Sequence, residues 1–230
     1  MKLYHDPFSA PARAVRCFLL DEGIAFDEHV IGLMSGDHLA EGFDTVNPNR
    51  QVPVPVDGAF HLTESAAILK YLADKYHSPA YPHDIQARAR VNETMDWFNT
   101  GFLFNFAYAL VYTSILPEFT TMNVVSRSDI EHMGAVKSRK YLEVLDRHML
   151  AGHDYLCGND ITIADYHGAA LTNMGTAIDF NFSRYPNVTA WLARMADRPG
   201  WEPSFAAFNG FVAAMRAEPE RMKALLATHP

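Results

Sequence analysis

The chain has 230 residues, of which 49% are apolar and 20% are charged, and these shares are ordinary for a folded globular protein. Its formal net charge of -8 argues against a nucleic-acid partner, because phosphate-backbone binding requires a basic face. At about 100–200 residues per domain, the length allows one large domain or two small ones.

Segment 98–117 is the one stretch apolar enough to need weighing as a membrane span. It carries Asn99, Asn105 and Thr113 along its length, which favours a buried helix of a water-soluble protein, so we expect no membrane segment. Cys17 and Cys157 lie far apart, and the histidines are dispersed. This pattern favours a reducing compartment, the cytoplasm by default, and predicts no metal site.

The first third of the chain alternates strand and helix signals. Apolar residues at helical spacing, and a Gly stop or a Pro start at their ends, mark the helices. Asp57-Gly58 is a hairpin turn signal. The expected elements are a strand at 2–5, a helix at 10–21, a strand at 26–31, a short helix at 37–43, a hairpin at 54–62 and a helix at 64–76. This order predicts an α/β thioredoxin-like N-terminal domain over residues 1–77.

The remainder of the chain is expected to be helical. Two prolines in 78–84 oppose helix and predict a linker. After it, segments without strand alternation predict an all-α C-terminal domain over 85–216, followed by a tail at 217–230. The expected helices are 85–117, 128–150, 163–178, 188–197 and 203–216. Thr162 and Asp165 have the spacing of a capping box at the start of the third of these helices, which is a structural signal.

Ser9 is the first candidate for chemistry. It precedes Pro11 at a predicted helix start, where free amides and the positive end of the helix dipole stabilise an anion. Its hydroxyl has two interpretations at this stage: it stabilises a thiolate, or it is only an N-cap, a position at which serine is common.

Two further segments offer backbone groups to a ligand. If the Val52-Pro53 bond is cis, the backbone of Val52 turns outward and can pair with an extended peptide. Glu64 and Ser65 open the next helix, where the first amides and the serine hydroxyl suit a carboxylate and the glutamate suits an ammonium group.

In this order and spacing, these motifs resemble the glutathione S-transferase family, especially its theta-like and bacterial dehalogenase-like members. The resemblance rests on segments 3–15, 47–53, 56–58, 64–72, 154–159 and 161–166 and so covers most of the chain. It implies the fold described above, glutathione as co-substrate, a small electrophile as second substrate and a homodimer.

The resemblance also implies roles for single residues. Ser9 is similar to the family's catalytic serine, Val52 and Pro53 to the residues that pair with the cysteinyl backbone, and Glu64 and Ser65 to those that hold the γ-glutamyl end. His38 and Gln51 are expected near the glycine carboxylate, although Gln51 replaces a lysine common in theta-like members. Weaker candidates for the electrophile pocket are Phe8, Tyr108 and Tyr112.

A second interpretation keeps the fold without catalysis. Length and tail are also similar to those of a glutathione-transferase-like bacterial division protein that binds the FtsZ polymer. In that case the tail, with Leu225, Leu226, Thr228 and His229, docks on a protein partner. The tail alternatively covers a site or is a loosely held terminus.

Overall fold

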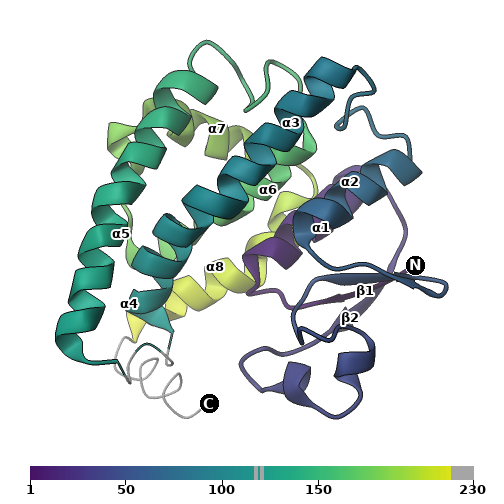
Figure 1. Ribbon diagram of the computed structural model, residues 1–230, viewed down its shortest axis with the longest axis horizontal. Helices are drawn as coiled ribbons and strands as arrows, with labels where there is room; N and C mark the ends of the chain where they lie inside the picture. Colours follow the sequence, from purple (N-terminus) through teal and green to yellow (C-terminus); the bar gives the residue numbers. More distant parts are fainter. Residues whose placement is uncertain (117–118, 120–121, 219–230) are drawn as a thin grey trace. The chain divides into compact units, whose positions relative to one another are not determined.

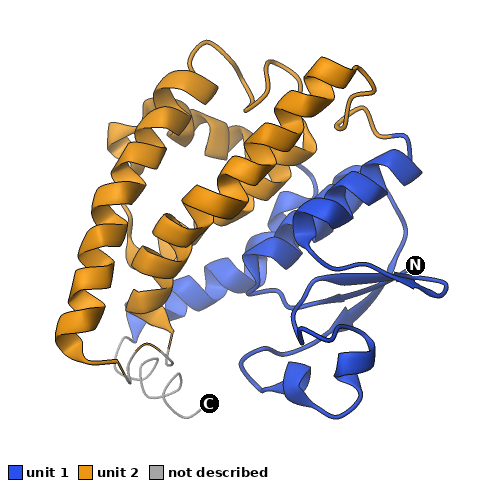
Figure 2. Ribbon diagram, in the orientation of Figure 1, with its two compact units in different colours: residues 1–77, 198–230 blue, residues 78–197 orange. Residues whose placement is uncertain are grey.

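The computed structural model describes residues 1–116, 119 and 122–218. They form two compact units, shown in Figure 2: residues 1–77 with the described residues from Arg198 onward, and residues 78–197.

A four-stranded sheet organises the first unit, with strand order β2-β1-β3-β4. β1 (Lys2–His5) pairs in parallel with β2 (Asp27–Val30) and antiparallel with β3 (Val54–Asp57), which pairs antiparallel with β4 (Phe60–His61). α1 (Ala10–Asp21) and α2 (Ser65–Lys75) pack on each other and lie along the sheet in Figure 1. This mixed sheet with its helices is the predicted thioredoxin-like fold.

Local signals explain these elements. α1 presents Val15, Phe18 and Leu19 to the core, all fully buried, in the spacing that the sequence predicted. Gly58 has a φ of 66°, so the predicted hairpin turn uses the left-handed conformation that glycine adopts freely. The short helix predicted at 37–43 is wrong: Gly42, with a φ of 90°, separates two single turns, η1 (Asp37–Leu39) and η2 (Phe43–Thr45).

α8 (Trp201–Ala217) belongs to the first unit by its contacts, although the sequence analysis grouped it with the helical domain. It packs on α1, where the guanidinium of Arg13 lies 4.7 Å from the ring centroid of Phe205 and 3.8 Å from that of Phe208. At the other end of α1, Asp21 accepts from the Gly200 amide at 2.6 Å and from Arg198 at 2.8 Å. These contacts are long-range, so local periodicity carried no sign of them.

The second unit is helical. Its elements are α3 (Ile85–Trp97), η3 (Phe98–Tyr112), α4 (Thr113–Ile115), α5 (Val124–Val144), η5 (Leu145–Met149), α6 (Ile163–Asn173), η6 (Met174–Ile178), η7 (Phe182–Arg184) and α7 (Pro186–Ala196). α3, η3 and α4 follow one another without a break, and η3 has the wider π-helical hydrogen bonding. α5 begins four residues earlier than expected because the Asn123 side chain caps it, accepting from the Val125 amide at 2.9 Å. Within the described residues, no helix is long and apolar enough to span a bilayer.

Asp165 holds the second unit together at the start of α6. Its carboxylate is fully buried and accepts from the Thr162 amide at 2.8 Å, the Thr162 hydroxyl at 3.0 Å, the Leu156 amide at 2.8 Å and the Trp191 indole at 3.0 Å. The predicted capping box is therefore present, and it extends to a loop and to α7. Burial raises the pKa of Asp165 to about 6, while these donors act in the opposite direction.

We expect Asp165→Asn to lower the free energy of unfolding by about 2 kcal/mol at pH 7, because the new amide faces donors on one side. The pKa of Asp165 is higher in the folded than in the unfolded chain, so its ionisation costs stability as pH rises from about 4 to about 6. The advantage of the natural chain over the variant should therefore widen on acidification across this range. Thermal unfolding of both proteins as a function of pH measures it. If the difference in free energy of unfolding between the two proteins shrinks on acidification, the hydrogen-bond donors affect the pKa of Asp165 more than burial does.

Candidate functional site

Ser9 lies where α1 begins, immediately after β1 and a tight turn. It is the N-cap of α1, and its Oγ accepts from the Ala12 amide at 3.4 Å. The first turn of α1 contains no acidic side chain of its own. Since the hydroxyl accepts from an amide, its proton is available for donation to an anion in front of the helix. The capping and the anion-binding interpretations of Ser9 are thus compatible.

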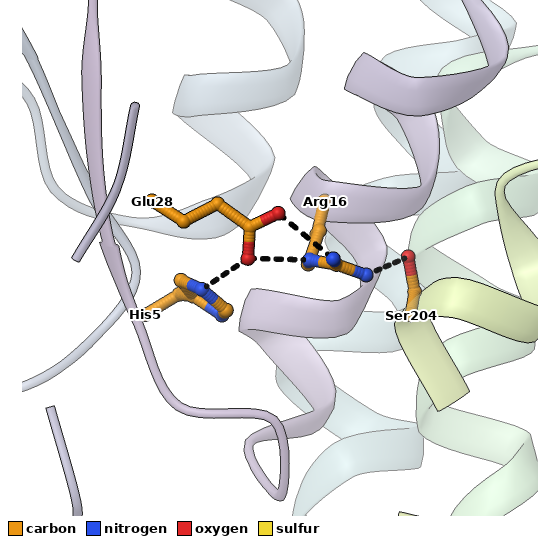
Figure 3. A network of polar contacts seen from close by, with 4 residues as sticks. All are labelled: His5, Arg16, Glu28 and Ser204. Carbon is orange, nitrogen blue, oxygen red and sulfur yellow. Dashed lines mark hydrogen bonds and ion pairs between the residues drawn. The ribbon is translucent and has the colours of Figure 1, made fainter. Parts of the chain in front are cut away.

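A network of polar contacts fixes the strand end before this turn, as Figure 3 shows. The Glu28 carboxylate on β2 contacts Nε2 of His5 on β1 at 3.1 Å. It also accepts hydrogen bonds from Nε and Nη2 of Arg16 on α1, at 3.1 and 2.8 Å. Arg16 also reaches the Ser204 hydroxyl on α8 at 3.5 Å. The hydrogen bond from Arg16 lowers the pKa of Glu28, and burial lowers the pKa of His5. At neutral pH this is an ion pair beside a neutral imidazole, and it joins four elements.

The Val52-Pro53 peptide bond is cis, the isomer that the sequence left open. Val52 precedes β3 and is buried as a side chain. Among the described residues, neither its N–H nor its C=O takes part in a hydrogen bond. Because backbone polar groups are rarely left without partners, this pair of groups is available to an extended ligand.

The start of α2 offers a second set of backbone donors. Glu64 precedes the helix with a φ of 65° and a ψ of 106°, and its side chain makes no capping hydrogen bond. No acidic side chain lies in the first turn of α2, whose free amides and Ser65 hydroxyl can donate hydrogen bonds to a carboxylate. A glutamate in this backbone conformation is strained, and such strain is concentrated at functional sites.

Arg50, a residue to which the sequence did not point, links the segments that carry His38 and Gln51. Arg50 directly precedes Gln51 and donates from Nη1 to the carbonyl of Leu39, which directly follows His38. The His38 side chain is half-buried, and its Nδ1 is buried without a hydrogen-bond partner among the described residues. Arg50 also has a positive φ of 53° and pairs with Asp44 at 3.5 Å, and no sequence pattern pointed to these features.

The three pocket candidates fall into different units. Phe8 is 36% exposed beside Ser9, and its ring meets that of Phe211 on α8 edge to face at 5.3 Å. Phe211 was not predicted. Tyr108 and Tyr112 lie on η3 in the second unit and pack edge to face at 5.0 Å.

One set of predicted site residues lies outside the described part of the chain. Leu225, Leu226, Thr228 and His229, the predicted partner-binding residues, lie outside the described residues. No cluster of three or more His, Cys, Asp or Glu side chains that could hold a metal occurs within residues 1–116, 119 and 122–218.

Comparison with known proteins gives matches over both units. Residues 3–80 match the family model of the glutathione S-transferase N-terminal domain, and residues 132–199 match that of the C-terminal domain. The chain is 35% identical to mouse glutathione S-transferase theta-1 over 200 residues, which cover 85% of this chain and 82% of that protein. It is 33% identical to rat theta-2 over 218 residues, which cover 94% of this chain and 88% of the relative.

Solved structures show the same likeness. Human glutathione transferase theta-2, solved in complex with glutathione and an unknown ligand, has a TM-score of 0.84 and 26% identity, covering 100% of this chain and 99% of that one. A delta-class glutathione transferase from Nilaparvata lugens has a TM-score of 0.82 and 28% identity, covering 97% and 99% of the two chains. The sequence identity, the two domain matches and the fold agree, and this chain belongs to the glutathione S-transferase family.

Proposed function

We propose that this protein conjugates glutathione to a small electrophile, with Ser9 stabilising the glutathione thiolate. The observation that carries the proposal is the unpaired N–H and C=O of Val52 in the same unit as the hydroxyl of Ser9 and the open start of α2. Glutathione is an extended peptide with a carboxylate at each end, an ammonium group and a thiol. These groups are complementary to the donors and acceptors that the first unit leaves open.

Each part of the tripeptide has a proposed partner. The cysteinyl backbone pairs with Val52 beside cis-Pro53, and the γ-glutamyl carboxylate takes the first amides of α2 and the Ser65 hydroxyl. The γ-glutamyl ammonium group pairs with Glu64. His38 and Gln51 lie near the glycine carboxylate, with Arg50 holding their segments together.

The reaction needs the thiolate, because the thiol is a weak nucleophile. The proton leaves the sulfur for solvent, and the Ser9 hydroxyl donates a hydrogen bond to the sulfur that remains. The thiolate then attacks the electrophilic carbon, a C–S bond forms and the leaving group departs with its electron pair. Phe8, which is partly exposed beside Ser9 in the first unit, is the apolar residue that we assign to the electrophile.

The alternative function, a non-catalytic adaptor for a division protein, has no support in these observations. Its residues lie outside the described part of the chain, and the relatives reported above are transferases by name. The free cysteines Cys17 and Cys157 agree with a reaction carried out in the cytoplasm.

The first test follows the thiolate. The purified protein is titrated with reduced glutathione by calorimetry, and the ultraviolet absorbance of the bound thiolate is recorded as a function of pH. The natural chain should bind glutathione, and the pKa of the bound glutathione thiol should lie below the value of about 8.5 for an unperturbed cysteine thiol. Ser9→Ala should still bind but return the thiol pKa toward that value, with about a hundredfold lower turnover, since one donor to the developing anion is lost.

Ser78→Ala is the matched control, because it removes another serine hydroxyl that accepts from a backbone amide, that of Ala80 at 3.2 Å. Glutathione bound to Ser78→Ala should have the same thiol pKa as glutathione bound to the natural chain. A thiol pKa that Ser9→Ala leaves unchanged would remove Ser9 from the mechanism, and undetectable glutathione binding by the natural chain would contradict the proposed function itself.

A second prediction separates stability from binding at Glu64. Glu64→Gly should raise the free energy of unfolding by up to about 1 kcal/mol, because glycine adopts a positive φ without strain. The same variant should bind glutathione about tenfold more weakly, since a charge-assisted hydrogen bond to the ammonium group is lost. Thermal unfolding and calorimetric titration measure the two effects.

His77→Gly is the control for this prediction, because His77 also has a positive φ, 54°, but is exposed at the other end of α2. It should gain stability and bind normally. Unchanged glutathione affinity in Glu64→Gly would dissociate Glu64 from the ligand.

We also propose a homodimer formed through the second unit. Phe104 and Tyr108 on η3 and Met133 and Val136 on α5 are between 36% and 56% exposed, and the two helices pack against each other. An apolar surface of this kind is typical of protein interfaces. Light scattering should give twice the chain mass of 25.8 kDa, and Val136→Lys should shift the equilibrium toward the monomer. A natural chain that stays monomeric would contradict the proposal.

A further inference from the structure

Asp6 is a buried carboxylate directly after β1, with 1% of its surface exposed. Each of its carboxylate oxygens accepts a hydrogen bond from a different segment. Oδ1 accepts from the Phe8 amide at 2.5 Å, and Oδ2 accepts from the Leu33 amide at 2.8 Å. Buried charges are retained where their hydrogen bonds are satisfied, and both oxygens of Asp6 are used on backbone donors.

The first of these hydrogen bonds shapes the turn that carries Ser9. A side-chain oxygen that accepts from the amide two residues ahead forms an Asx turn. The backbone carbonyl of Asp6 adds a second bond, accepting from the Ser9 amide at 3.1 Å. Asp6 thus fixes the backbone on which the Ser9 hydroxyl is mounted.

The second hydrogen bond reaches the loop that leads to His38. Leu33 follows β2, and its carbonyl accepts from the Gly36 amide at 3.2 Å. Gly32 and Asp37 are joined twice: the Asp37 amide donates to the Gly32 carbonyl at 3.0 Å, and the Gly32 amide donates to the Asp37 carboxylate at 3.0 Å. Because this loop is closed on itself, an anchor at Leu33 also sets the position of η1, where His38 lies.

From this geometry we infer that Asp6 is a positioning residue that couples the thiolate-stabilising turn at Ser9 to the His38 segment at the other end of the glutathione site. The inference rests on the proposed function. Asp6 touches neither substrate nor reacting atoms in this scheme; it acts through Ser9 and through Leu33. The two carboxylate oxygens therefore have separable effects, one on the thiol pKa and one on glutathione affinity.

Two substitutions separate these effects. Asp6→Ala removes both hydrogen bonds, so the thiol pKa of bound glutathione should rise by at least about half the shift that Ser9→Ala causes, with weaker binding as well. Asp6→Asn keeps an acceptor for the Phe8 amide, but its own amide group faces the Leu33 amide. It should therefore keep the thiol pKa of the natural chain and bind glutathione about fivefold more weakly, the loss of one hydrogen bond.

Asp21 supplies the matched control. Its side chain is also fully buried in the first unit and also accepts from a backbone amide, that of Gly200, but it lies at the far end of α1. Asp21→Ala and Asp21→Asn should destabilise the fold with the thiol pKa and glutathione affinity unchanged. Calorimetric titration and the pH dependence of thiolate absorbance are measured for all variants, with thermal unfolding beside them.

The outcomes are distinct. Two results would each overturn the coupling of Ser9 to the His38 segment while leaving the proposed function intact. One is that bound glutathione has the same thiol pKa in Asp6→Ala as in Asp21→Ala. The other is that Asp6→Asn binds glutathione as tightly as Asp21→Asn does. If Asp6→Ala does not fold, the affinity of Asp6→Asn decides. A natural chain that does not lower the thiol pKa would contradict the proposed function, and the inference with it.

Discussion

Backbone groups left open in the first unit are the feature on which the proposed site depends. Val52 forms no backbone hydrogen bond among the described residues, and the starts of α1 and α2 carry no acidic side chain in their first turns. A buried or half-buried backbone group without a hydrogen-bond partner lowers the free energy of unfolding, so other interactions must offset its cost. These backbone groups stay unpaired only if the surrounding backbone is held in place, so that the protein's own side chains do not pair with them. We call the residues that hold this backbone the frame of the site.

Buried carboxylates supply much of that frame. Asp6 accepts from the amides of Phe8 and Leu33, and Asp21 accepts from Gly200 and Arg198. The second unit uses the same device within itself, where Asp165 joins the start of α6 to a loop and to Trp191. In each case a short side chain with two oxygens connects segments that are distant in sequence. Aspartate suits this role because its carboxylate has two acceptor oxygens and its side chain has few rotatable bonds.

The sequence predicted what depends on neighbouring residues. β1, α1, the hairpin and the capping box at Asp165 follow from alternation, helical spacing, Asp57-Gly58 and the Thr162–Asp165 spacing. Ser9, Glu64 and Ser65 were found because helix starts have local signatures, and the structure places each of them at such a start. The break at Gly42 was missed because apolar spacing across 37–43 imitates a helix, whereas the positive φ of that glycine interrupts it.

What the sequence could not predict depends on contacts between distant segments. Arg50, Phe211 and the anchoring role of Asp6 have no local pattern, and each is defined by a partner elsewhere in the chain. The same holds for the placement of α8 in the first unit.

The packing of α8 on α1 connects the C-terminal part of the described chain to the helix that starts at Ser9. Arg13, at the end of the first turn of α1, lies against the rings of Phe205 and Phe208, and Arg16 contacts Ser204 while it pairs with Glu28. Gly200 approaches α1 so closely that a Cβ there would lie 2.4 Å from the Cys17 carbonyl oxygen. The two ends of α1 are thus fixed by α8 and by the segment before it. The helix that Ser9 caps is thus packed against residues almost 200 positions away, which join the first unit although the helical domain separates them from it in the sequence.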